Sequence, residues 1–298
     1  MTLLEALERR VLLGDGAMGT QLQQAGLPPG GCGEAWNLDV PDKILAIQRA
    51  YVEAGSDCLI TNTFGGSRIM LNRHQEGDRT RDINRAGAEI ARRAFGGGEG
   101  FVLGDMGPFG GLMEPYGEIP AAVVEKAFAE QAQALVDAGV DAIIIETQTS
   151  LDELGIAIQA AKAAGAVCII GSMAFDKLQE GNEVRTMMGT SPEQAAEFMA
   201  ENGCHILALN CGTGIDMDIA ADTARRYRSI SKLPIMAQPN AGLPVLENLK
   251  VLYKETPDEM VAGLPNLLQA GVRIVGGCCG STPAHIRKFK EVLMHGRN

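Results

Sequence analysis

The chain has 298 residues, of which 26 are Lys or Arg and 37 are Asp or Glu, so its formal net charge is −11. Hydrophobic residues make up 46% and charged residues 21%, a balance that excludes an intrinsically disordered chain and allows a large buried core. The excess of acidic residues, with no basic run longer than an Arg–Arg pair, argues against nucleic acid or an anionic membrane surface as a partner.

The N-terminal segment does not resemble a secretory signal. Glu5, Glu8, Arg9 and Arg10 interrupt its first ten residues, so the continuous apolar core of a signal peptide is missing. No window reaches the roughly 18 apolar residues of a membrane span. We therefore expect a cytoplasmic protein without a membrane partner. Because that compartment keeps thiols reduced, the seven cysteines are not expected to form a disulfide framework.

Eight short apolar runs predict eight buried strands along the chain. Each run leads into Gly, Asn, Thr, Cys or another small or polar residue at its carboxyl end. The runs cover residues 11–19, 58–65, 101–108, 142–149, 168–175, 206–212, 234–242 and 274–280.

Segments with helical periodicity alternate with these runs, and several start with Ser, Thr or Asp and end in Gly, as helix caps prefer. They cover residues 41–55, 81–95, 120–139, 151–165, 191–203, 217–230, 256–271 and 282–296. Eight apolar strands followed by eight helices predict an α/β fold, a (β/α)₈ TIM barrel in which residues 1–298 form a single domain. A doubly wound open sheet is the alternative. Its glycine-rich turn is matched weakly by Gly14, Gly16 and Gly19, and the acidic residue expected on the next strand is absent.

In a barrel of this kind, the carboxyl ends of the strands line the active site. Cys211, Cys278 and Cys279 fall at two such ends, which are two strands apart and can converge above the barrel mouth. The other polar residues at the predicted strand ends are Asp15, Asn62, Thr63, Asp105, Glu146, Ser172, Asn210, Gln238 and Asn240.

Three thiolates at one point suit Zn²⁺, which prefers four tetrahedral ligands and keeps one position open in catalytic sites. The competing interpretations are a strained disulfide between the adjacent Cys278 and Cys279, or buried thiols without a function. We interpret Cys58, Cys168 and Cys204 as buried apolar residues of the strands, and Cys32 as an exposed loop thiol.

A zinc ion surrounded by three anionic sulfurs generates hydroxide poorly, because the ligands neutralise its charge. It is suited to binding a substrate thiol, lowering the thiol pKa and holding the thiolate as a nucleophile. The residue pattern therefore indicates transfer of an electrophilic group to sulfur.

Six motifs together resemble the zinc-dependent homocysteine S-methyltransferases, and most closely the homocysteine-binding barrels of cobalamin-dependent methionine synthases. The motifs are GDGAMGT (14–20), TNTFGGSR (61–68), ETQTS (146–150), LNCG (209–212), PNAG (239–242) and GGCCGSTPAHI (276–286). The resemblance implies a (β/α)₈ barrel in which Cys211, Cys278 and Cys279 hold zinc. It also implies an enzyme that activates homocysteine, or a related thiol, as a zinc thiolate, which accepts a methyl group to give methionine.

The resemblance assigns further residues to the substrate. Asp15 and Glu146 are expected to bind the amino group of homocysteine, since an ammonium in a pocket needs an anionic partner. The resemblance also points to substrate contacts, or donors behind the metal ligands, at Asn62, Thr63, Ser172, Asn210 and Asn240.

The methyl donor is expected to be a methylcobalamin-type corrinoid on a separate protein, because the sequence predicts the barrel without the folate, cobalamin and reactivation domains of methionine synthases. The alternative is a stand-alone enzyme that uses S-methylmethionine or a betaine. One Trp and 4% aromatic residues offer little for an aromatic cage around such a cation. Outside this class remain a non-catalytic zinc or redox thiol protein, in which Asp15 and Glu146 share no purpose, and a metal-free barrel lyase.

Overall fold

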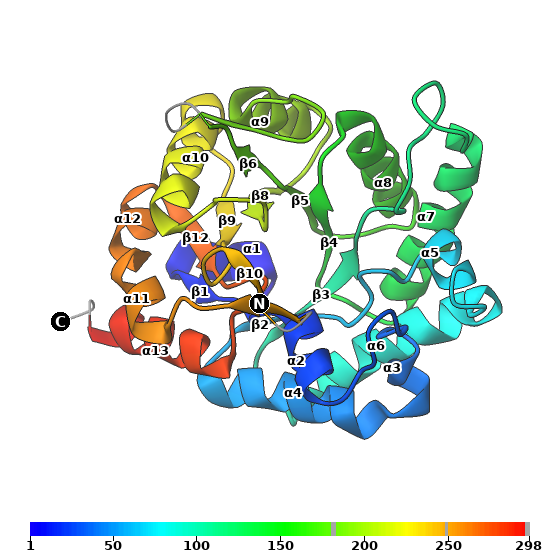
Figure 1. Ribbon diagram of the computed structural model, residues 1–298, viewed down its shortest axis with the longest axis horizontal. Coiled ribbons are helices and arrows are strands. Elements are labelled where there is room, and N and C mark those ends of the chain that lie inside the picture. The colour runs from blue at the N-terminus through cyan, green and yellow to red at the C-terminus, as the bar shows by residue number, and fades with distance from the viewer. Residues whose placement is uncertain (180–182, 248–249, 296–298) are drawn as a thin grey trace.

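Eight parallel strands form a nearly closed barrel, as the sequence predicts, in a computed structural model that describes residues 1–179, 183–247 and 250–295 (Figure 1). Their order in the sheet is β1-β12-β9-β8-β5-β4-β3-β2. The two ends meet where the backbone N–H of Asp57 donates to the Leu13 carbonyl oxygen over 2.7 Å. The barrel strands are β1 (Leu12–Leu13), β2 (Cys58–Ile60), β3 (Phe101–Met106), β4 (Ala142–Gln148), β5 (Ile169–Met173), β8 (Ile206–Asn210), β9 (Ile235–Gln238) and β12 (Val272–Val275).

Helices surround the barrel in Figure 1 and largely match the periodic segments of the sequence. Ser150, Ser191, Asp216 and Thr256 cap four of them by accepting a backbone N–H of the first turn. Within the described ranges, no helix has the length and apolar character needed to cross a membrane. The main helices are α4 (Pro41–Ala54), α6 (Thr80–Ala94), α7 (Ala121–Asp137), α8 (Leu151–Ala163), α9 (Pro192–Glu201), α10 (Met217–Ile230), α11 (Pro257–Ala262), α12 (Leu264–Gln269) and α13 (Pro283–His295).

The structure corrects two boundaries. Residues 256–271, predicted as one helix, form α11 and α12, because Pro265 lacks the N–H that a helix interior needs and fits only a first turn. The run 11–19 was predicted as a strand, yet β1 ends at Leu13 and helix α2 begins at Met18.

Short elements that periodicity does not predict occupy the connections. They include two antiparallel hairpins that follow β5 and β9 along the chain. These short elements are α1 (Leu3–Arg9), α2 (Met18–Gln24), α3 (Trp36–Asp39), α5 (Arg68–Asn72), η1 (Gly77–Arg79), β6 (Asp176–Lys177), β7 (Val184–Arg185), β10 (Pro244–Glu247) and β11 (Lys250–Tyr253).

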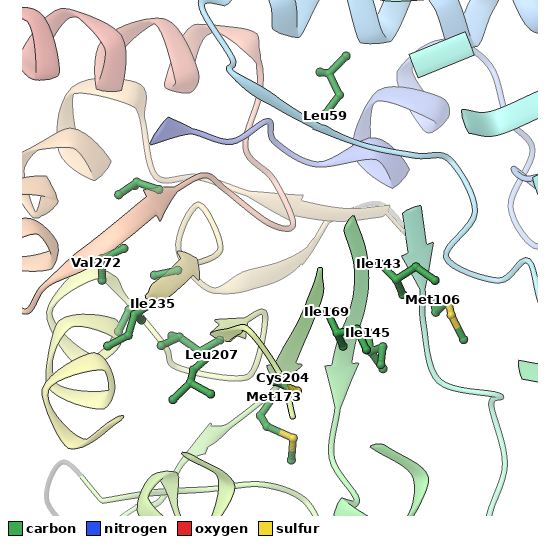
Figure 2. Close-up of a cluster of buried hydrophobic side chains, with 14 of the residues drawn as sticks. Leu59, Met106, Ile143, Ile145, Ile169, Met173, Cys204, Leu207, Ile235 and Val272 are labelled. Carbon is green, nitrogen blue, oxygen red and sulfur yellow. The ribbon is translucent and has the colours of Figure 1, made fainter. Parts of the chain in front are cut away.

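The apolar core has two parts, because alternate residues of each strand point inside and outside the barrel. The inner part packs residues such as Ile60, Ile144 and Ile274 with Leu3 and Leu7 of α1, so this helix covers one end of the barrel interior. The outer part lies between the strands and the helices, and Figure 2 shows a selection of its side chains. The filled interior leaves the rim at the strand ends as the place for a site.

Glu153 in the first turn of α8 permits a test of this burial. Its side chain is buried, and its Oε1 accepts the backbone N–H of Phe109 over 2.7 Å. Burial raises the pKa of Glu153 from its ordinary value of 4.5 to about 7, although the Phe109 bond opposes this shift. The folded chain therefore binds more protons than the unfolded chain between pH 4.5 and 7, and its free energy of unfolding falls as the pH rises through this window.

We expect Glu153→Gln to match the wild type in stability near pH 4.5 and to exceed it by at most about 3 kcal/mol at pH 8. The helix N-terminus favours the ionised carboxylate, so this value is an upper bound. Glutamine keeps the oxygen that accepts the Phe109 N–H. Urea unfolding at both pH values measures the difference, and a difference that does not change with pH would contradict the assigned pKa.

Candidate metal centre

Three cysteines converge at the carboxyl ends of β8 and β12, the strands on either side of β9. Cys211 follows β8 directly, and Cys278 and Cys279 lie in the turn after β12. Their sulfur atoms all lie within 4.8 Å of one another, and the Cys211 and Cys279 sulfurs are 3.9 Å apart. A tetrahedral zinc ion with Zn–S bonds of ~2.3 Å needs sulfurs roughly 3.8 Å apart. The cysteine sulfurs therefore suit a zinc ion.

Left-handed backbone conformations present these sulfurs. Cys211 has φ of 56°, and the glycine after it, Gly212, has φ of 87°. A Cβ atom on Gly212 would lie 1.8 Å from the carbonyl oxygen of Phe175, so only glycine fits there. Gly280, which follows the cysteine pair, has φ of 82° and lies against Tyr253 of β11. The glycines of the motif thus have a steric function.

Hydrogen bonds among the three thiols shift their pKa values in opposite directions. Hydrogen bonds from Cys278 and Cys279 lower the pKa of Cys211, and these same bonds to Cys211 raise the pKa of Cys278 and of Cys279. A thiolate at Cys211 therefore opposes ionisation of the other two. A divalent cation would remove this opposition, because thiolates bind it in place of protons.

A cavity of about 300 Å³ lies beside the sulfur atoms at the barrel mouth. Its wall is formed by all three cysteines, by carboxylates and by mixed apolar and polar groups. The lining residues are Asp15, Gly16, Ala17, Met18, Gly19, Thr20, Leu22, Glu34, Ile60, Thr61, Asn62, Phe64, Asp105, Glu146, Thr147, Cys211, Gln238, Gly277, Cys278 and Cys279.

Asp15, Asp105 and Glu146 bring carboxyl groups from three strand ends to this cavity. Burial raises the pKa of Asp15 well above its ordinary range, although one of its oxygens accepts the Ile60 N–H over 2.7 Å. Burial and the nearby Glu146 raise the pKa of Asp105 in the same direction. Burial also raises the pKa of Glu146 to about 7, while a hydrogen bond with Asp105 opposes that shift. No Lys or Arg lines the cavity among the described residues, so a cationic ligand would relieve the repulsion between these carboxylates.

The buried Oδ1 atoms of Asp15 and Asp105 have no hydrogen-bond partner among the described residues. Buried polar atoms normally have one, and an unmet acceptor in a cavity is a place for a ligand donor. Asp105 lies at a predicted strand end, yet the sequence assigned it no function. Its proximity to Glu146 and Asp15 makes it a third candidate, beside these two predicted residues, for binding an ammonium group.

Five neutral polar residues were predicted to contact the substrate. Two of them, Thr63 and Asn62, use their side chains in hydrogen bonds with other groups of the protein. Thr63 is fully buried, and its hydroxyl pairs with Thr61 and donates to the Asp105 carbonyl oxygen. Asn62 lines the cavity, but its amide nitrogen donates to the Gly33 carbonyl oxygen and to Asn37.

The other three, Ser172, Asn210 and Asn240, lie behind the cysteine triad. The Ser172 hydroxyl donates to Asn210 over 2.6 Å, and the Asn210 amide nitrogen lies 3.8 Å from the Cys278 sulfur. Asn240 donates to the Gly212 carbonyl oxygen, and its side chain also lowers the pKa of Cys211. Through these bonds the three residues support the cysteine segments, and they are not among the residues that line the cavity.

Thr147 and Glu34 line the cavity but were not predicted from the sequence. Strand alternation directs Glu146 into the barrel and Thr147 away from it, so periodicity alone would not place Thr147 at the cavity. Glu34 belongs to the glycine-rich segment 28–36, and it accepts the backbone N–H of Gly65 over 2.8 Å.

The remaining cysteines lie away from the triad. Cys58, Cys168 and Cys204 are buried, as predicted. Cys32 was expected to be exposed but is partly buried, and its thiol lies 3.6 Å from the Glu34 carboxylate.

Comparison with known proteins places most of the chain in one family. The family model described as homocysteine S-methyltransferase matches residues 12–293. The methionine synthases of Mycobacterium tuberculosis and Mycobacterium leprae are each 36% identical to the chain over 306 aligned positions, which cover 98% of it. The chain spans about a quarter of the length of these relatives, because only 25% of each is covered.

Solved structures share the fold. The homocysteine methyltransferase MmuM from Escherichia coli, in its metallated form, superposes with a TM-score of 0.78 over 97% of this chain and 99% of that one, at 22% identity. Its apo form gives a TM-score of 0.73 over 97% and 98% of the two chains. At this identity the likeness supports the barrel fold alone.

Proposed function

Because the chain belongs to the homocysteine S-methyltransferase family, we propose that it transfers a methyl group to the sulfur of homocysteine and yields methionine. The observation that carries the proposal is the cysteine triad, whose sulfurs lie within 4.8 Å of one another, beside a cavity rich in carboxylates. Thiolates would hold the metal and carboxylates the amino acid, so the cavity matches both ends of a thiol-bearing amino acid.

Cys211, Cys278 and Cys279 would hold zinc, which supplies a Lewis acid that binds the substrate thiol and lowers its pKa. The acceptor thiol gives up its proton and forms the S–CH₃ bond, and the donor keeps the electron pair of the bond that breaks. Asp15 and Glu146 bind the substrate ammonium, and the Oδ1 atom of Asp105, which has no partner among the described residues, accepts a further hydrogen bond from it. The apolar side chains of Leu22, Ile60 and Phe64 line the same cavity and would limit access of water.

The methyl donor in this proposal is a methylcobalamin-type corrinoid carried by a separate protein. Two observations favour it over S-methylmethionine or a betaine. The cavity beside the cysteine triad is here called the metal cavity. Among its described lining residues, Phe64 is the one aromatic side chain, and a single ring cannot form a cage around a methylated cation. Large apolar side chains are also exposed in the connections after β3 and β5, namely Leu112, Tyr116, Met187 and Met188, and such exposure is typical of protein docking surfaces.

A direct assay tests the activity and the donor together. Zinc-loaded protein is incubated with L-homocysteine and free methylcobalamin, S-methylmethionine or glycine betaine, and methionine is quantified by mass spectrometry. We expect methionine from methylcobalamin well above the two small donors. Methionine from a small donor alone would contradict the corrinoid assignment, and no methionine from any donor would favour a non-catalytic zinc protein.

A further inference from the structure

Thr147 has an unusual backbone conformation at the wall of the metal cavity. Its φ is 59°, a region that β-branched residues avoid because the side chain crowds the backbone. The pairing of β4 with β5 shifts register between Ile145 and Gln148, so Thr147 lies in a bulge. Strained residues of this kind persist only where neighbouring groups hold them.

The side chain of Asn210, at the end of β8, contacts Thr147 twice. Its Oδ1 accepts the Thr147 backbone N–H over 2.9 Å, and its Nδ2 donates to the Thr147 hydroxyl over 2.8 Å. The first bond settles the amide orientation, because a backbone N–H requires an acceptor. The Ser172 hydroxyl, 2.6 Å from the same Oδ1, keeps that oxygen in place.

The bulge changes which side chains face the cavity. Regular alternation would place only one of Glu146 and Thr147 at the wall, yet both line the metal cavity. Thr147 also lines a second cavity of about 460 Å³ between the connection after β3 and Met187, so it forms a partition between the two. The Thr147 conformation therefore determines the shape of the wall beside Glu146.

We infer that Asn210 is a positioning residue, which holds Thr147 in its left-handed conformation and thereby sets the Glu146 carboxylate and the cavity wall for the amino acid substrate. The inference rests on the proposed function for its substrate, and on the hydrogen bonds of Asn210 for its geometry. It differs from direct substrate binding by Asn210, because the amide has both of its ends occupied by Thr147, Ser172 and Cys278.

A double-mutant cycle separates positioning from direct contact. Glycine adopts positive φ without strain, so Thr147→Gly makes the support of Asn210 dispensable. We expect Asn210→Ala to raise the KM for homocysteine about tenfold in the wild-type background and less than about twofold in the Thr147→Gly background. Each KM ratio compares two variants of the same background, so any direct contribution of the Thr147 hydroxyl to substrate binding cancels.

Zinc content is measured in each variant, because Asn210 also lies near Cys278, and it should stay at the wild-type level. An equal rise in KM in both backgrounds, or no rise in either, would overturn the inference. A crystal structure of Asn210→Ala gives a reading independent of activity: a negative φ at Thr147 supports the inference, and a retained positive φ refutes it. If the wild type forms no methionine, the proposed function fails while this structural reading still decides the inference.

Discussion

Replacing Cys278 or Cys279 by alanine is expected to reduce the zinc content from about one ion per chain to background and to abolish methionine formation. Each change removes one of three thiolates that would hold the metal. Two remaining protein ligands are fewer than known zinc sites use, and no fourth cysteine joins this cluster among the described residues. Metal analysis by mass spectrometry after purification under reducing conditions measures the loss.

Cys168→Ala is the matched control. Cys168 is buried just before β5 and lies outside the triad, so its removal should lower stability slightly and leave zinc unchanged. Circular dichroism should show a folded barrel for all three variants, because their strands and helices are unaltered. Full zinc occupancy in both triad variants would refute the assignment of these cysteines as ligands.

Glu146→Gln is expected to weaken homocysteine binding by about 10- to 100-fold without loss of zinc. The neutral amide removes a negative charge from the cavity wall and leaves the substrate ammonium with a weaker partner. Calorimetric titration of the zinc-loaded variant with L-homocysteine measures the dissociation constant. An affinity equal to that of the wild type would remove Glu146 from the ammonium site.

Asp105→Asn is the control that separates charge from shape. Burial and the nearby Glu146 raise the pKa of Asp105, so Asp105 is the member that donates when its hydrogen-bonded pair with Glu146 holds one proton. An asparagine nitrogen can donate in its place, so this variant should lose less affinity than Glu146→Gln. The reverse order would mean that Asp105, rather than Glu146, carries the negative charge.

Much of the fold follows from local patterns in the sequence. Apolar runs such as 142–149 mark strands buried on both faces, and their spacing by helices predicts the barrel, which the structure confirms. The hairpins after β5 and β9 were not predicted, because strands of two to four residues are too short to carry a periodic signal. The break between α11 and α12 could have been read from Pro265.

The candidate site was predictable where chemistry coincides with strand ends. The convergence of Cys211 with Cys278 and Cys279 follows from barrel topology, since β8 and β12 flank β9. Thr147 could not be predicted, because its position depends on a backbone conformation that Asn210 supports from another strand. Tertiary hydrogen bonds of this kind leave no mark in local sequence.

X-ray absorption at the zinc edge, with and without L-homocysteine, tests the central claim most directly. Without the amino acid, we expect three sulfur ligands and one nitrogen or oxygen ligand, in line with three cysteines whose sulfurs lie within 4.8 Å of one another. With homocysteine, the fourth ligand should become sulfur. Protein without zinc, or a zinc environment that homocysteine leaves unchanged, would contradict thiol activation at this site.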